Sequence, residues 1–171
     1  MRNMHRLLLL AALLPALQGC FPVVAGGVGA GITMASDRRT SGIFIEDQGI
    51  ELKAQSRLSD KLKDQAHINV TSYNLALLLT GEAPNPMVRA EAESVAQAVP
   101  NVRQVFNEVA VGPLSSFSNR SNDGYLTTKV KARMVEANKF NIVHVKVVTE
   151  ASVVYLLGIV TRKEAEDATE I

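Results

Sequence analysis

Tryptophan is absent from this sequence, and aromatic residues make up only 5% of its 171 residues. Because 47% of the residues are hydrophobic, a folded core must be built mainly from aliphatic side chains. Positive and negative charges almost balance, and the formal net charge is +1. The chain therefore lacks the strong positive field that attracts nucleic acid, and we expect no nucleic-acid partner.

A second cysteine is also lacking, so the chain cannot form an internal disulfide. Cys20 follows a positively charged start and an apolar run over residues 7–14, which is the pattern of a secretory signal peptide. Leu17-Gln18-Gly19-Cys20 resembles a bacterial lipoprotein signal box. The resemblance implies removal of residues 1–19 and attachment of acyl chains, such as palmitate, at Cys20. The alternative is an ordinary signal peptide with a chance cysteine.

After the signal peptide, no stretch reaches the roughly 18 consecutive apolar residues that a transmembrane helix needs. Residues 21–34 are rich in glycine, valine and alanine, and glycine at this density disfavours both helix and strand. We interpret residues 20–45 as the lipidated cysteine followed by a flexible tether. Attachment to a membrane then depends mainly on the acyl chains.

Motifs of enzymes are missing as well. The sequence contains no GxSxG nucleophile motif, no HExxH zinc motif and no phosphate-binding P-loop. His67 and His144 stand at equivalent places before two strand-like runs, but no cysteines or paired carboxylates accompany them in the sequence. We therefore predict a protein that is not an enzyme, with no cofactor and no metal.

The remaining sequence contains an internal repeat, in which residues 67–81 align without a gap with residues 144–158. Each segment holds two β-rich runs, preceded by a helical pattern and followed by an acidic, alanine-rich helical pattern. In the first copy a further strand is predicted over residues 105–111. The sequence thus predicts an α+β fold of two tandem αββαβ domains, each a mixed three-stranded sheet with two helices on one face.

We place the first domain at residues 46–113 and the second domain at residues 124–171. Residues 114–123 between them have the glycine, proline and serine content of a linker. By comparison with the first domain, the second stops inside its last helix, before a turn and a third strand. We therefore expect the second domain to be truncated at its C-terminal end.

Three segments of the first domain carry a family resemblance: Leu79-Thr80-Gly81, the alanine-rich helix over residues 90–98, and the run Val99-Pro100-Asn101-Val102-Arg103-Gln104-Val105-Phe106-Asn107. They resemble the BON domain family, although Pro100 and Phe106 are local variants. Two such domains behind a lipoprotein signal are similar to outer-membrane lipoproteins of Gram-negative bacteria, whose domains face the periplasm. The resemblance implies binding of anionic phospholipids such as phosphatidylglycerol or cardiolipin, and support of membrane integrity. Because the acyl anchor raises the effective concentration of a weak lipid contact, we also expect lateral sorting toward division sites.

The resemblance also implies that the lipid contact is the first helix of the second domain, and the residues of that helix favour the same place. Between residues 125 and 146, five basic residues stand against one acidic residue, whereas four stand against three in residues 51–69. Each basic side chain near an anionic surface contributes about 1 kcal/mol.

Helix geometry selects individual residues on this helix. Leu126, Val130 and Met134 form a core stripe, because they repeat at intervals of four residues. Tyr125 and Val135 project on the opposite side, where apolar tips between cations suit a helix that enters lipid headgroups. Lys129 and Lys131 flank these two residues. The candidate phospholipid-binding residues on this helix are Tyr125, Lys129, Lys131, Arg133 and Val135. The alternative for this face is an ordinary solvated surface.

A different function also fits the sequence. The two domains would then form an adaptor that docks onto envelope proteins, such as outer-membrane assembly factors or regulators of peptidoglycan hydrolases, and lipid contact would be incidental.

Overall fold

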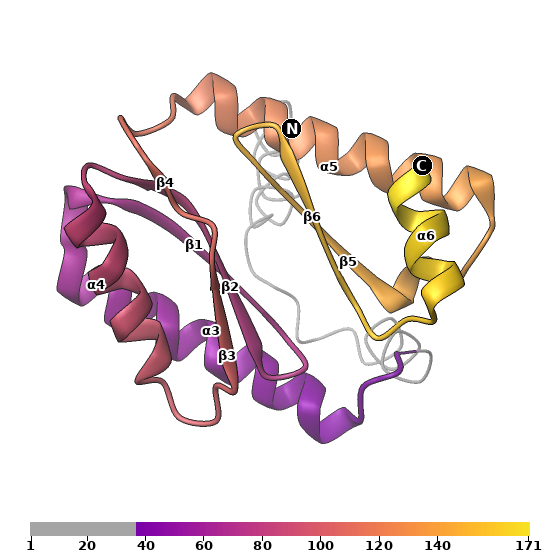
Figure 1. The fold of residues 1–171 in the computed structure, drawn as a ribbon, viewed down its shortest axis with the longest axis horizontal. Helices are drawn as coiled ribbons and strands as arrows, with labels where there is room; N and C mark the ends of the chain where they lie inside the picture. Colours follow the sequence, from indigo (N-terminus) through magenta and orange to yellow (C-terminus); the bar gives the residue numbers. More distant parts are fainter. Residues whose placement is uncertain (1–36) are drawn as a thin grey trace, which may run out of the picture. The chain divides into compact units, whose positions relative to one another are not determined.

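The computed structural model describes residues 37–171 (Figure 1). The expected signal peptide, Cys20 and most of the expected tether lie outside the described residues. The described chain forms two successive α+β domains in the predicted order of helices and strands. None of the helices within residues 37–171 combines the length and the apolar character needed to cross a bilayer.

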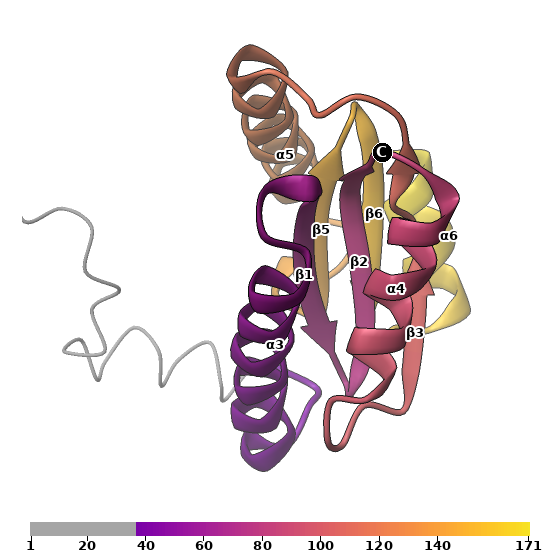
Figure 2. The same ribbon diagram turned by 90° about the vertical axis from the view of Figure 1, so that its left-hand side faces the viewer.

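The first domain is a mixed sheet covered by helices on one face. In chain order its elements are α3 (Ser41–Leu62), the short 3-10 helix η2 (Lys63–Gln65), β1 (His67–Tyr73), β2 (Ala76–Ala83), α4 (Pro86–Gln97), β3 (Gln104–Asn107) and β4 (Ala110–Val111). Strand β2 pairs antiparallel with β1 and parallel with β3 and β4, which follow one another along its other edge. Figure 2 views the sheet through α3 and α4, which lie side by side in front of it.

The strand predicted over residues 105–111 is interrupted in the structure. The side chain of Val109 turns into the core and is 1% exposed, while the Asn107 side chain accepts a hydrogen bond from the Val109 amide. Pairing with β2 resumes at Ala110. One edge of β2 is therefore covered by a third strand in two pieces.

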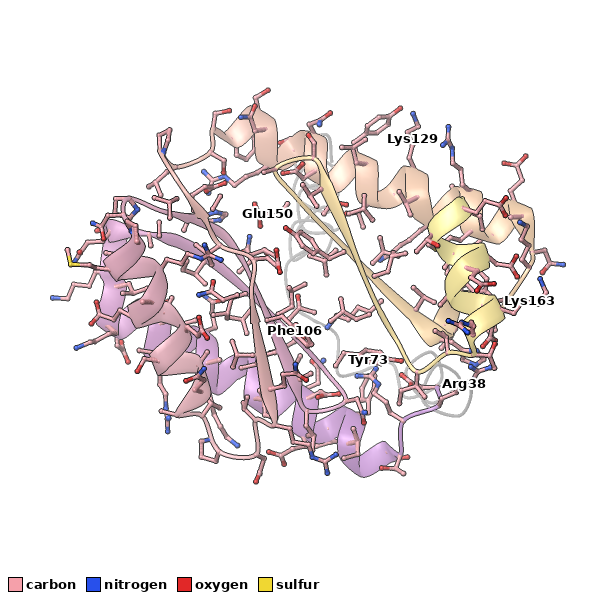
Figure 3. All side chains as sticks on the ribbon, in the orientation of Figure 1. Arg38, Tyr73, Phe106, Lys129, Glu150 and Lys163 are labelled. Atoms are coloured by element: carbon pink, nitrogen blue, oxygen red, sulfur yellow. The ribbon has the colours of Figure 1, made fainter. Side chains whose placement is uncertain are left out.

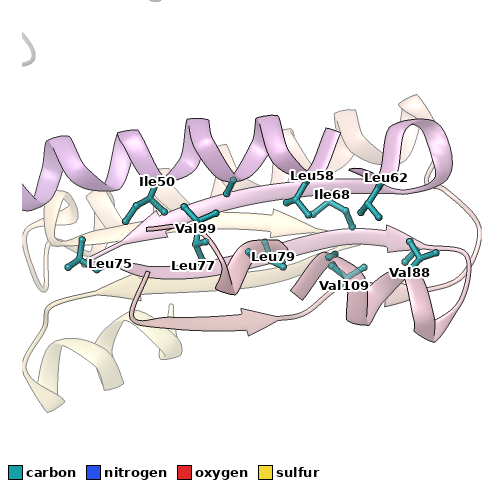
Figure 4. Packing of buried hydrophobic residues seen from close by; sticks show 14 residues of the cluster. Ile50, Leu58, Leu62, Ile68, Leu75, Leu77, Leu79, Val88, Val99 and Val109 are labelled. Atoms are coloured by element: carbon teal, nitrogen blue, oxygen red, sulfur yellow. The ribbon is translucent and has the colours of Figure 1, made fainter. Parts of the chain in front are cut away.

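Aliphatic side chains fill the space between the helices and the sheet (Figure 4). Ile50, Leu58 and Leu62 of α3 are buried at helical spacing and meet Leu77 and Leu79 of β2. Strand β2 is buried along nearly its whole length, because its other face contacts the second domain. A continuous apolar run is the pattern expected for a strand covered on both faces.

Both predicted helices of the first domain begin at identifiable caps. The Thr40 hydroxyl accepts a hydrogen bond from the Ile43 amide, so α3 begins at Ser41, inside residues 20–45 that the sequence assigns to the lipidated cysteine and its tether. The Asn85 side chain caps α4, and Pro86 occupies the first turn as the sequence predicts.

A buried carboxylate in the first helix of each domain holds the hairpin turn that follows. Asp47 is fully buried and accepts hydrogen bonds from the backbone amides of Asn74 and Leu75, each at 2.8 Å. Asp123 does the same for Ala151 and Ser152 in the second domain, at 3.0 and 2.8 Å. All four turn residues have positive φ angles, which are unfavourable for residues other than glycine. The carboxylates thus offset the strain of these turns.

The second domain contains α5 (Phe117–Ala137), the 3-10 helix η3 (Ile142–His144), β5 (Val145–Glu150), β6 (Val153–Gly158) and α6 (Arg162–Glu170). Strands β5 and β6 pair antiparallel, and within the described residues β6 has no other strand partner. Its core is smaller and centres on Met134, Val145, Val147 and Ala168. Helix α6 begins at a capping box formed by Thr161 and Glu164.

Residues 117–123, which the composition assigns to a linker, are instead the first turns of α5. Ser116 caps this helix by accepting a hydrogen bond from the Asn119 amide. Asp123, placed in the linker by the sequence, is buried at the β5–β6 turn. The helix thus begins at a local cap, and a tertiary contact then buries Asp123 two turns later.

Hydrogen bonds join the two domains at several places. Arg38, just before α3, donates to both carboxylate oxygens of Glu164 at 2.7 Å and to the carbonyl of Ile159 at 2.9 Å. Lys146 of β5 donates to Glu51 of α3 at 2.6 Å. The segment that precedes the first domain is thus tied to the last helix of the second.

Acid is expected to weaken the contact between Arg38 and α6. The hydrogen bonds from Arg38 and from the Thr161 backbone hold the pKa of Glu164 at about 2, below its ordinary 4.5. Because the folded-state pKa is depressed, the stabilisation is complete above about pH 4.5 and disappears as the pH falls toward 2. Thermal unfolding followed between pH 6 and pH 2 should therefore show a smaller loss of Tm for Glu164→Gln than for the wild type. Parallel profiles would contradict this assignment.

Candidate functional site

Helix α5 presents all five candidate lipid-binding residues to solvent. Tyr125 and Val135 are each 60% exposed, and Lys129, Lys131 and Arg133 are exposed as well. Lys129 points away from the strands in Figure 3. The structure therefore brings the predicted residues together on one helix, with apolar and cationic side chains interleaved.

The opposite side of α5 holds the helix on its domain. Met134 is 1% exposed and Val130 packs against the same core, whereas Leu126 is only half-buried. The predicted core stripe is thus confirmed at two of its three positions. At about 100° per residue, this stripe leaves Tyr125 and Val135 on the outer side.

The three candidate cations lack carboxylate partners within residues 37–171: Lys129, Lys131 and Arg133 form no ion pair there. The Lys129 ammonium instead lies 5.7 Å from the centre of the Tyr125 ring, within range of a cation–π contact. Cations that are already exposed and unpaired lose no salt bridge when they meet an anionic surface.

The other two basic residues counted in the sequence are engaged within the fold. Lys139 lies 2.8 Å from Glu170, and this hydrogen bond raises the pKa of Lys139. Lys146 lies 2.6 Å from Glu51 of the first domain. The charge available on the second domain is therefore smaller than the sequence count of five indicates, and it is concentrated on α5.

Sequence reasoning missed one exposed aromatic residue on this helix. Phe117 is 80% exposed in the first turn of α5. It precedes Val135 by 18 residues, or five helical turns, so the two side chains share one side of the helix. The spacing is readable in the sequence, but the linker-like composition of residues 114–123 hides that Phe117 is helical. We define the exposed face of α5 by six residues that extend from its first turn to its last: Phe117, Tyr125, Lys129, Lys131, Arg133 and Val135.

A second group of polar residues lies away from this face. His67, Glu82 and Glu150 bring their potential ligand atoms within 4.8 Å of one another. The sequence shows no paired carboxylates near His67, whereas the structure places Glu82 and Glu150 beside it. The sequence does not indicate that Glu82 and Glu150 lie close together, because they come from different domains.

Comparison with known proteins agrees with this architecture. The BON domain family model matches residues 46–113 and 122–171. The chain is 38% identical over 157 residues to the outer membrane lipoprotein DolP of Haemophilus influenzae, an alignment covering 91% of this chain and 81% of the relative. It is 30% identical over 141 residues to a 21 kDa hemolysin of Actinobacillus pleuropneumoniae, covering 81% of this chain and 73% of the relative. These matches show that the chain belongs to the BON domain family and carries two BON domains in tandem.

Proposed function

We propose that this protein is a non-catalytic outer-membrane lipoprotein whose second BON domain binds anionic phospholipids through the exposed face of α5. The observation that carries the proposal is the combination on one helix of exposed Phe117, Tyr125 and Val135 with cations that form no ion pair within residues 37–171. The similarity to an outer membrane lipoprotein over 91% of the chain supports the lipoprotein assignment. The signal box ending at Cys20 supports it independently.

The physical mechanism has two parts. Lys129, Lys131 and Arg133 are attracted by the negative surface potential, which contributes about 1 kcal/mol for each cation and is screened by salt. The tips of Phe117, Tyr125 and Val135 add apolar burial at the level of the headgroups, where aromatic rings with a polar edge are favoured. Neither part requires a catalytic group.

Acylation at Cys20 supplies the stronger anchor in this proposal. Two or more acyl chains hold a protein far more firmly than a shallow helix contact, because each buried methylene contributes about 0.8 kcal/mol. The anchor keeps α5 close to the periplasmic surface and raises its effective concentration there. The weaker contact then biases the protein toward regions rich in anionic lipid, such as division sites, and so supports envelope integrity.

Cosedimentation with vesicles tests the lipid contact without the acyl anchor. The chain from Phe21 to Ile171 should sediment with phosphatidylglycerol or cardiolipin vesicles at about 50 mM salt, and several-fold less at about 500 mM, because salt screens the cations. It should not sediment with phosphatidylcholine vesicles. Failure to bind either anionic vesicle would remove the proposed contact and favour the adaptor function, with a protein partner.

A further inference from the structure

Both BON domains contribute to one cluster of metal-ligating side chains. His67 and Glu82 face each other across the β1–β2 pair, and the His67 Nδ1 atom lies 3.2 Å from the Glu82 Oε2 atom. Glu150, the last residue of β5, joins them from the second domain (Figure 3). The carboxylate residues are 5% and 6% exposed, and His67 is partly buried.

Neighbouring side chains hold the two carboxylates in place. Asn69 and Thr80 form the next cross-strand pair on the same face of the sheet, and they donate to the Glu150 Oε2 atom at 2.6 and 3.1 Å. The Ser115 amide donates to Glu82 Oε2 at 3.1 Å. Hydrogen bonds that orient carboxylates in this way are typical of the surroundings of metal ligands.

The cluster has more negative than positive charge. Two buried carboxylates lie close together, and like charges at short range are unfavourable in a poorly solvated site. Within the described part of the chain, neither carboxylate is paired with a lysine or an arginine; Arg120 lines the opening beside them without forming an ion pair. The Ser115 hydroxyl, next to Glu82, is buried and has no hydrogen-bond partner among the described residues. A bound cation would balance this charge.

We propose that His67, Glu82 and Glu150 form a binding site for one divalent transition-metal ion, such as Zn²⁺ or Mn²⁺, held between the two BON domains. One imidazole and two carboxylates are a donor set that suits these ions. A tetrahedral zinc with bonds near 2.1 Å sets its ligands roughly 3.4 Å apart. The 3.2 Å between His67 and Glu82 is close to this spacing.

An ion could reach this site from solvent. An open pocket of about 430 Å³ is lined by His67, Asn69 and Glu150 together with Asp123 and Thr127 of α5. Because its ligands come from both domains, a bound ion would fasten the second BON domain to the outer face of the first sheet. This site is separate from the exposed face of α5, and it does not depend on the proposed lipid contact.

The test is a titration of the full chain, purified in detergent and freed of metal with a chelator, with zinc chloride and then with manganese chloride. Calorimetry should give one tight site per chain, and zinc should raise the Tm, since a ligand that binds only the folded state stabilises it. Glu150→Gln keeps the size and the hydrogen-bond acceptor of the side chain, and it should weaken the zinc affinity about tenfold or more. His67→Gln should have a similar effect.

Glu136→Gln is the matched control, since Glu136 is an exposed carboxylate on α5 outside the cluster. It should leave the affinity unchanged, and circular dichroism should verify that every variant is folded. X-ray absorption at the zinc edge should show one histidine nitrogen together with oxygen ligands. The proposal is overturned if the folded wild type binds neither ion, or if folded Glu150→Gln binds zinc as tightly as the wild type.

Discussion

Tyr125→Glu and Val135→Glu are each expected to abolish most of the binding to phosphatidylglycerol vesicles while the second BON domain stays folded. Both side chains are 60% exposed, so neither change removes core packing. A new anion at the lipid surface costs about 1 kcal/mol, and the lost apolar contact costs about as much again. A total of about 2 kcal/mol corresponds to a roughly thirtyfold weaker affinity.

The first BON domain offers a control of the same chemistry. Met87 of α4 is 78% exposed, so Met87→Glu introduces the same charge on an exposed apolar position away from α5. It should reduce sedimentation only slightly, through the change in net charge. Phe117→Glu, on the same side of α5 as Val135, should behave like Val135→Glu. Equal losses for Met87→Glu and Val135→Glu would mean that net charge, and not this face of α5, governs binding.

The exposed face of α5 was largely predictable because it depends on local geometry. Once residues 125–135 are helical, the core contacts of Val130 and Met134 fix which side chains face outward. The charge balance was less predictable. Lys139 and Lys146 look free in the sequence, but their partners Glu170 and Glu51 lie 31 and 95 residues away. Ion pairs of such separation follow from tertiary structure, which the local pattern does not contain.

The order of helices and strands was also predictable, because apolar runs and cap residues mark it in each copy. The burial of the carboxylates was not predictable from the sequence. Asp47 sits in a helix beside charged residues, and its burial becomes favourable through the turn at Asn74 and Leu75, which lies 27 and 28 residues later in the chain. Arg39 adds an ion pair to Asp47 at 2.8 Å. The same limit applies to Glu150, whose role depends on contact between two domains.

Gly81→Ala is expected to destabilise the first BON domain strongly. Gly81 lies in β2 opposite Ile68 and has a φ angle of +113°, which residues with a Cβ atom rarely adopt. A Cβ atom there would lie 1.9 Å from the carbonyl oxygen of His67 and 2.9 Å from its carbon. Since these are backbone atoms, only separation of β1 from β2 relieves the clash. We expect the free energy of unfolding to fall by about 4 kcal/mol or more, which is a large part of the stability of a small domain.

Alanine variants at two other glycines serve as comparisons, and the stability of all three variants is measured by denaturant unfolding followed by circular dichroism. A Cβ atom on Gly158, the equivalent residue of the second domain, would lie 2.7 Å from the His144 carbonyl oxygen, so Gly158→Ala should destabilise less than Gly81→Ala. Gly124 lies in α5 with nothing within 4 Å of an added Cβ, so Gly124→Ala should stabilise the helix by up to about 1 kcal/mol. Any other order of the three midpoints would contradict the close pairing of β1 with β2. That pairing also sets His67 opposite Glu82, so a Gly81→Ala variant as stable as the wild type would also contradict the geometry of the proposed metal site.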